Sequence, residues 1–112
     1  MTVPVLNRRL VLEEMQRVPD GAGGFTTAWS VLGTLWASVV AGTGAERAGE
    51  FVTLSTVPYR ITVRGAPMGA ASRPRPDQRL RDGARLFRIL AVTEADARAA
   101  YLTCFAREEV PS

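Results

Sequence analysis

The sequence predicts a small all-β domain, a barrel or sandwich of about six antiparallel strands with two long loops and little helix. Three observations lead to this prediction. Apolar and polar residues alternate with period two along most of the short apolar runs, which is typical of half-buried strands. Gly, Pro and Asp, which favour turns, separate those runs. The 112 residues fit one domain, so we expect a single unit over 1–112.

The N-terminal half predicts a long hairpin. Residues 9–18 are rich in Leu, Val and Met and are expected to form the first strand. Residues 19–24 combine Pro, Asp and three glycines, which is typical of a turn that needs positive φ. Strand character returns in residues 25–31 and 35–40. Gly33, between these two runs, indicates a bulge or bend in one longer strand.

Two loops and the clearest strand occupy the middle of the chain. Residues 41–50 contain three glycines and several charges, and they are predicted to be a long loop. Residues 59–64 alternate cleanly, with Tyr59, Ile61 and Val63 expected to face the core. Residues 65–78 contain three prolines and are predicted to be the second long loop.

The C-terminal part predicts a second hairpin and a last strand. A short strand around Leu80 and a strand over 85–92 flank Asp82-Gly83, a pair that suits a type I′ turn. Residues 101–107 alternate again and are expected to form the final strand. A loose tail is predicted from Glu108 onward.

The largest apolar side chains within the predicted strands are expected to form the core. The five that we assign to it are Trp29, Trp36, Ile61, Phe87 and Ile89. If Trp36 is a core residue, Trp36→Ala should lower the free energy of unfolding by about 3–5 kcal/mol. Tyr59, Tyr101 and Phe105 are also predicted to face inward, which leaves no exposed aromatic row for stacking nucleic-acid bases.

Composition excludes most catalytic chemistry. The chain has no lysine and no histidine: its 14 basic residues are all arginine, against 11 acidic residues, for a net charge of +3. Histidine-based proton transfer and metal ligation are therefore excluded, as are lysine Schiff bases and lysine-containing phosphate loops. A GC-rich genome, which favours Arg and Ala codons, explains the missing lysine better than selection for phosphate-binding arginines does.

No nucleophile or carboxylate pair stands out in the sequence. Cys104 has no histidine partner and lies in a predicted strand, as a small core residue would. Glu13 and Glu14 are adjacent and would point to opposite faces of a strand. Asp77 and Asp82 flank a short strand. We therefore predict a protein that is not an enzyme and has no catalytic residue, cofactor or metal site. A carboxylate-dependent hydrolase ranks last among the alternatives.

We also expect no membrane association. No apolar run approaches the roughly 20 residues that a helix needs to cross a bilayer. The segment from Met1 to Arg9 lacks the apolar stretch of a signal peptide. We therefore expect the protein to be made in a cytoplasm, where a single thiol is unremarkable.

The arginines leave two interpretations open. Six of them lie within residues 73–88, against Asp77 and Asp82. If they shared a face, a small basic barrel that binds nucleic acid would follow. A solvated sheet face with ordinary salt bridges between subunits is the favoured interpretation. The residues assigned to possible contacts with DNA or with neighbouring subunits are Arg60, Arg64, Arg73 and Arg75.

The order of short motifs resembles that of the head–tail joining proteins of long-tailed bacteriophages, also called head-closure or stopper proteins. The matching segments, in chain order, are Leu6-Asn7-Arg8-Arg9-Leu10, Asp20-Gly21-Ala22-Gly23-Gly24, Trp29, Trp36-Ala37, Gly44-Ala45-Glu46, Tyr59-Arg60-Ile61-Thr62-Val63-Arg64, the hairpin from Asp82 to Ile89, and Tyr101-Leu102. Each segment alone is weak, whereas the ordered set is fairly specific. The Pro-rich segment 65–76 departs from the pattern because it is longer than the usual connector.

The resemblance implies a structural role in a virion or a phage-like particle such as a gene transfer agent. Copies of the chain would form a ring, six-fold by this resemblance, at the head–tail interface. An adaptor protein would lie above the ring, with a tail terminator or tail tube below it and packaged double-stranded DNA passing through the channel. The loop over 41–54 would correspond to the channel-facing loop, with Gly42, Gly44, Glu46, Arg47 and Glu50 as candidate contact residues. A neighbouring tail-terminator role is the alternative within the same class.

Overall fold

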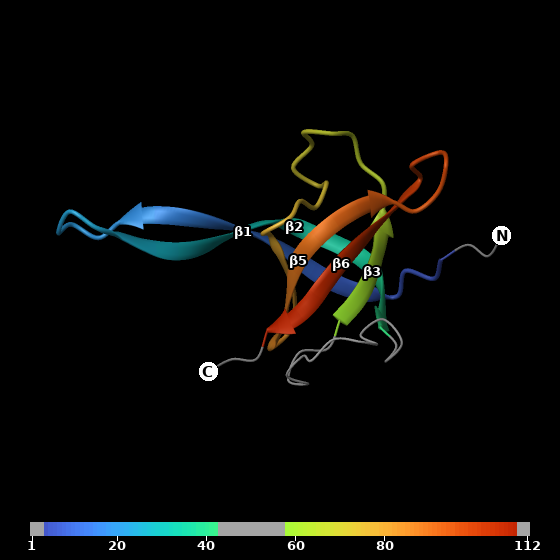
Figure 1. Ribbon diagram of the computed structural model, residues 1–112, viewed down its shortest axis with the longest axis horizontal. Coiled ribbons are helices and arrows are strands. Elements are labelled where there is room, and N and C mark those ends of the chain that lie inside the picture. Colours follow the sequence, from blue (N-terminus) through green and yellow to red (C-terminus); the bar gives the residue numbers. More distant parts are fainter. Residues whose placement is uncertain (1–3, 43–57, 110–112) are drawn as a thin grey trace, which may run out of the picture.

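The computed structural model describes residues 4–42 and 58–109, which form a closed barrel of six antiparallel strands without a helix. The all-β prediction is confirmed. The strands are β1 (Arg8–Pro19), β2 (Phe25–Ala41), β3 (Pro58–Arg64), β4 (Arg79–Asp82), β5 (Arg85–Glu94) and β6 (Tyr101–Glu109). They follow the order β1-β2-β3-β6-β5-β4 around the barrel, and β4 closes it on β1 (Figure 1).

The barrel interior is filled by alternate residues of every strand. Ile61, Phe87 and Ile89 are fully buried there, as is the side chain of Cys104. The remaining apolar core residues are Leu10, Leu12, Ala37, Val63, Leu80, Leu102 and Ala106. Removing a large side chain of this kind from water stabilises the fold by about 1.5–3 kcal/mol, so this one cluster is the main source of stability.

The core assignment was wrong for Trp36, whose side chain is 58% exposed. Its neighbour Ala37 is fully buried, and successive side chains of a strand point to opposite faces. Trp36 therefore has to point outward. Trp29 is only half-buried and lies outside the barrel interior.

In the last strand, too, aromatic side chains that were expected to face the core point outward. Leu102, Cys104 and Ala106 occupy the inward positions of β6. The alternation therefore turns Tyr101 and Phe105 outward, and Phe105 is exposed, contrary to the inward orientation that its size predicted. Small side chains take these inward positions, which leaves the larger aromatic rings for the outer face.

The first hairpin extends well beyond the barrel. Residues 14–31, comprising the outer parts of β1 and β2 with the turn between them, project to one side as a two-stranded ribbon that we call the arm (Figure 1). Leu12 pairs with Gly33 and Glu13 with Val31, so Leu32 is the extra residue of a β-bulge. The interruption predicted at Gly33 is this bulge, and it marks the place where the arm leaves the barrel.

Both tight turns follow from side-chain chemistry. At the tip of the arm, Asp20 Oδ1 accepts hydrogen bonds from the amides of Ala22 at 2.8 Å and Gly24 at 3.0 Å, an arrangement that Asp favours. The β4–β5 turn has Gly83 and Ala84 as its two central residues, and only Gly83 has positive φ, at 61°. That φ pattern fits type II′, whereas the predicted type I′ turn would need positive φ at both central positions.

The second long loop lies where it was expected, between β3 and β4 over residues 65–78. Gly65 begins it, and a Cβ at that position would lie 2.1 Å from the carbonyl oxygen of Ala99, so no other residue fits there. The tail prediction was wrong at its start, because β6 continues to Glu109. Ion pairs to β5 hold Glu108 and Glu109 in the strand.

Candidate assembly surfaces

A buried carboxylate fastens the arm to the barrel. Glu13, at the root of the arm, is 4% exposed. It accepts hydrogen bonds from Arg79 Nε at 2.6 Å and Arg81 Nε at 3.0 Å. Burial works to raise the pKa of Glu13, but the hydrogen bonds and charges of the two arginines outweigh it and hold that pKa below its usual value. Glu13 is therefore an ionised link between β1 and β4.

Two further sets of contacts join the arm to the rest of the molecule. The Arg75 guanidinium donates to Glu14 Oε1 at 2.6 Å, which ties the second loop to β1. The indole of Trp29 lies beneath two guanidinium groups, with Arg79 at 4.1 Å and Arg88 at 5.2 Å from its ring. Cation–π contacts of this kind are worth about 0.5–2 kcal/mol each. Together these contacts fix the direction in which the arm leaves the barrel.

One face of the arm presents apolar side chains. Met15 is paired with Trp29, Pro19 with Phe25, and Glu13 with Val31, and cross-strand partners lie on the same face of a ribbon. Met15, Phe25 and Val31 are 43%, 56% and 60% exposed. Exposed apolar groups gathered in this way mark interaction sites.

The arm also has free edges. β1 pairs with β4 only over Val11–Glu13, and β2 pairs with β3 only over Ala37–Ala41. Beyond those positions, within residues 4–42 and 58–109, the backbone of each strand of the arm pairs only with that of the other. A two-stranded ribbon is marginal on its own, and unpaired edges recruit other strands. The arm is therefore a surface that a partner would stabilise.

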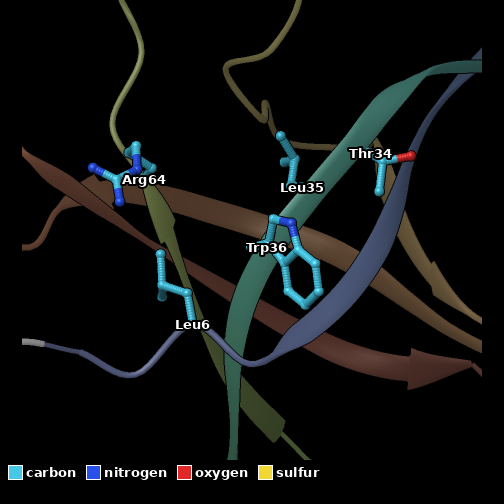
Figure 2. A pocket seen from close by; sticks show the side chains of 5 residues that line it. All are labelled: Leu6, Thr34, Leu35, Trp36 and Arg64. Atoms are coloured by element: carbon cyan, nitrogen blue, oxygen red, sulfur yellow. The ribbon is translucent and has the colours of Figure 1, made fainter.

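The second candidate surface is an open groove of about 510 Å³ on the barrel wall. We call it the groove; its lining residues are Leu6, Thr34, Leu35, Trp36 and Arg64. Figure 2 shows Trp36 at its centre, with Leu6 of the N-terminal segment and Arg64 of β3 together on one side and Thr34 on the other. An exposed tryptophan flanked by a leucine and an arginine is typical of the residue types enriched at protein interfaces.

A second ionic network is centred on the guanidinium group of Arg85. Arg85 donates to both carboxylate oxygens of Glu108, at 2.8 and 3.1 Å, and to the hydroxyl of Tyr59 at 3.0 Å. The Arg85 hydrogen bonds lower the pKa of Glu108. The ring of Tyr59 meets Phe87 edge to face, 5.0 Å between centroids. The network joins β3, β5 and β6.

The structure separates the four arginines that were assigned to possible contacts. Arg60 and Arg64 are exposed on the outward face of β3. Arg73 instead donates to the carbonyl oxygen of Ala66 at 3.0 Å, and Arg75 is paired with Glu14. These two therefore serve the loop itself, whereas Arg64 borders the groove.

The whole basic stretch is internally bonded. Besides Arg73 and Arg75, it contains four arginines in ion pairs with Glu13, Glu108 or Glu109, namely Arg79, Arg81, Arg85 and Arg88. Most of these side chains are engaged by carboxylates of the same chain, whereas Arg75 stays largely exposed and the Nε of Arg88 makes no hydrogen bond to the described residues. The salt-bridge interpretation therefore fits this stretch better than the nucleic-acid interpretation does, although the bonds lie within one chain rather than between subunits.

Most of the predicted channel loop lies outside the described residues, including Gly44, Glu46, Arg47 and Glu50. Gly42 is described, and its amide donates to the carbonyl oxygen of Pro58 at 2.7 Å. The β2 and β3 strands are thus held together at the point from which that segment starts and to which it returns.

No reactive centre is visible in the described part of the chain. Burial raises the pKa of the Cys104 thiol to about 12, so its thiolate is scarce at neutral pH. Over residues 4–42 and 58–109, no three His, Cys, Asp or Glu side chains are placed to hold a metal ion. The same residues include no helix that is long and apolar enough to span a bilayer.

Sequence reasoning missed the two ionic networks and the groove. Glu13 was dismissed because its neighbour Glu14 points the other way, but its partners come from β4, more than 60 residues along the chain. The arginine-rich second hairpin was the only signal in the sequence, since Glu13 directly follows Leu12 and alternation would place it on the opposite face from Leu10 and Leu12. The groove had no signal, since Trp36 was assigned to the interior.

Comparison with known proteins shows the family to which the chain belongs. Among curated proteins none matches significantly. A chain in the structure of a native gene transfer agent virion is 64% identical, with a TM-score of 0.80 over 98% of this chain and all of that one. The solution structure of a Shigella flexneri 2a protein shares the fold, with a TM-score of 0.73 at 23% identity over the full length of both chains. Residues 1–109 match the phage head completion proteins; the chain belongs to that family.

Proposed function

We propose that this chain is a connector subunit that forms a ring between the capsid and the tail of a phage-like particle. The ring would join a portal or adaptor assembly to a tail terminator or tail tube, retain packaged DNA in the channel and offer the surface to which the tail attaches. One observation carries the proposal: a chain 64% identical over nearly the full length is part of a native gene transfer agent virion.

The structure supports this role physically. The barrel is closed, so each of its strands is paired on both sides over at least part of its length. The arm and the groove are candidate contacts with neighbours, and Arg60 and Arg64 lie on an exposed strand face. A subunit of this design needs no reaction chemistry, because its work is to hold neighbours in register.

Electron microscopy of particles tests the proposal. We expect an epitope tag on the C-terminus of this chain to be found at the junction between head and tail, in several copies around the axis. The protein should also remain with particles through density-gradient purification. Its absence from purified particles would overturn the proposal. A position at the far end of the tail-side complex would favour the tail-terminator alternative.

The channel assignment of the loop is tested separately. Deleting Gly42 to Gly49 should leave a folded barrel, because the core residues that the structure describes all come from the six strands, but particles should lose packaged DNA or fail to join tails. A matched control is Arg98→Ala, in the exposed turn between β5 and β6. Particles with the deletion that hold nuclease-protected DNA and carry tails normally would show that the loop assignment is wrong.

Nucleic-acid binding by an isolated basic barrel is the weaker candidate, because the six arginines of residues 73–88 are bonded within the chain. Titration with a labelled oligonucleotide at low and at moderate salt decides the matter. We expect no sub-micromolar binding; tight binding with a steep salt dependence would favour this candidate instead.

A further inference from the structure

We propose that the apolar face of the arm of one copy docks into the groove of the next copy, so that the ring is built from repeated arm-in-groove contacts. This inference rests on the proposed ring, and it names the surfaces that would close it. The occupant of the groove is thus a second copy of this chain, presented through its arm.

The arm has the features of a surface that inserts into a partner. Its apolar side chains Met15, Phe25 and Val31 share one face with Arg17 and Thr27, and among the described residues no strand pairs with its outer edges. Arg17 lies over the ring of Phe25 at 4.3 Å, which holds that ring in place at the outer end. The Glu13 and Trp29 contacts fix the direction of the ribbon. A pre-oriented apolar surface loses little conformational freedom on docking.

The groove has the features of a surface that receives such an insertion. Its volume of about 510 Å³ accommodates several side chains, and the exposed indole of Trp36 lies among its lining residues (Figure 2). Leu6 provides an apolar wall. Buried tryptophan and arginine are the residues that most often dominate binding energy at protein interfaces. An aromatic ring such as Phe25 would find Trp36 as its partner there.

One acidic residue at the tip of the arm is complementary in charge to the rim of the groove, while the basic residue of the arm, Arg17, is engaged with the ring of Phe25. The tip of the arm carries Asp20, whose carboxylate is exposed while its Oδ1 holds the turn. The groove is bordered by Arg64, and Arg9 is the cross-strand partner of Trp36 on β1 and is exposed on the same face. An acidic tip against a basic rim favours one orientation of docking.

The placement of the two surfaces favours a second copy over an unrelated partner. In Figure 1 the arm projects from the barrel at one end of the long axis, whereas the groove is lined by residues of the barrel wall and of the N-terminal segment. The arm and the groove are thus different surfaces of one chain, and a contact between them in two copies is head-to-tail. Such contacts close into rings when the rotation between copies is right.

Thiol crosslinking within particles tests the contact. A chain with both Phe25→Cys and Leu6→Cys, treated with a short bis-maleimide, should yield a ladder of trimers and larger species on denaturing gels. Each single variant should stay monomeric, because a head-to-tail contact brings the two positions of different copies together. The native Cys104 can remain, since it is fully buried.

The matched control pairs Phe25→Cys with Leu90→Cys, an exposed apolar site on β5 away from the groove. This pair should give no ladder. If particles contain the double variant of the test but show no ladder, or show dimers only, the arm-in-groove contact is overturned while the ring proposal stands. If immunoblotting finds no protein in the particles at all, the proposed function fails, and this inference fails with it.

A truncation cycle gives an independent readout. Phe25→Ala and Trp36→Ala should each reduce incorporation into particles at least ten-fold, whereas Leu90→Ala should not. The double variant Phe25→Ala/Trp36→Ala should be little worse than either single one, because both changes remove the same contact. Losses that multiply in the double variant would show that the two side chains act at separate interfaces, and would contradict the proposal.

Discussion

Glu13 shows how a single residue sets the geometry of this molecule. Its carboxylate is out of water, yet two arginine Nε donors from β4 keep it ionised. A buried charge is tolerated only when hydrogen bonds compensate for its lost hydration. The compensating arginines come from β4, the strand that closes the barrel on β1. The same contact therefore joins β1 to β4 and orients the arm.

Glu13→Gln should lower the free energy of unfolding by about 3 kcal/mol, because it leaves two arginines without their counter-charge. We place the loss at the lower end of the range for buried pairs because Arg81 is partly in water. Urea unfolding measures it. Glu14→Gln is the control: its pair with Arg75 is exposed and should contribute less than about 1 kcal/mol. Equal stability of the Glu13 variant and the wild type would show that the link contributes nothing.

Stability should fall in acid through the same groups. The folded-state pKa values of Glu13 and Glu108 both lie below the ordinary value of 4.5. Their contribution is therefore fully present above pH 4.5 and is lost as the pH falls through the lowered values. Because the chain has no histidine, we expect little change between about pH 5.5 and 7. Thermal melts across this range test both statements, and the variant Glu13→Gln/Glu108→Gln should flatten the acid limb.

Trp36→Ala should now change stability by less than about 1 kcal/mol, because more than half of the side chain is in water. Thermal unfolding of the purified protein measures this. Phe87→Ala serves as the comparison: that ring is fully buried, and its loss should cost about 3–5 kcal/mol. A large loss for Trp36→Ala would mean that the indole supports the fold rather than a contact surface.

At the scale of elements, strand positions were predictable and strand faces were less so. The predicted runs 9–18, 59–64 and 101–107 lie within β1, β3 and β6 to within two residues at each end. Alternation and turn residues are local properties of the chain, which explains this success. Which of the two alternating sets of side chains faces inward depends on the space inside the barrel. Trp36 and Phe105 were assigned to the inside because of their size, and both point outward.

The candidate surfaces could be predicted only in part. The long first hairpin was visible in the sequence, but its projection beyond the barrel depends on where β4 and β3 stop pairing with it. The links from Glu13 and Glu108 join residues far apart in the chain, and no local pattern shows such partners. Most of the predicted channel loop lies outside the described residues and stays a prediction.

The arm should be separable from the barrel. Replacing residues 16–28 with a two-residue Asn-Gly turn would connect Met15 to Trp29, which are already paired across the ribbon, and would suit a type I′ turn. We expect the shortened chain to keep a cooperative thermal transition and the far-ultraviolet spectrum of a β protein, but to be absent from particles. Normal incorporation of the shortened chain would show that the arm is dispensable for assembly.

For the molecule as a whole, the shortest ladder of the barrel is the one between β1 and β4, which we call the seam. It consists of the pairs Val11–Arg81, Leu12–Leu80 and Glu13–Arg79. Short pairing of this kind opens locally at lower cost than the long β1–β2 ladder. Hydrogen exchange should therefore be fastest among core strands at the β4 amides, and Leu80→Ala should accelerate it further. Uniform protection around the barrel would contradict this expectation.

The separation of the arm from the hydrophobic core has a kinetic consequence. Every residue of the core cluster lies outside residues 14–31, so the barrel can reach its native state before the arm meets anything. Folding is then a unimolecular event and docking a later, bimolecular one whose rate rises with protein concentration. A cell that makes this protein could accumulate folded monomers and set the time of assembly by the amount of chain and the appearance of a template.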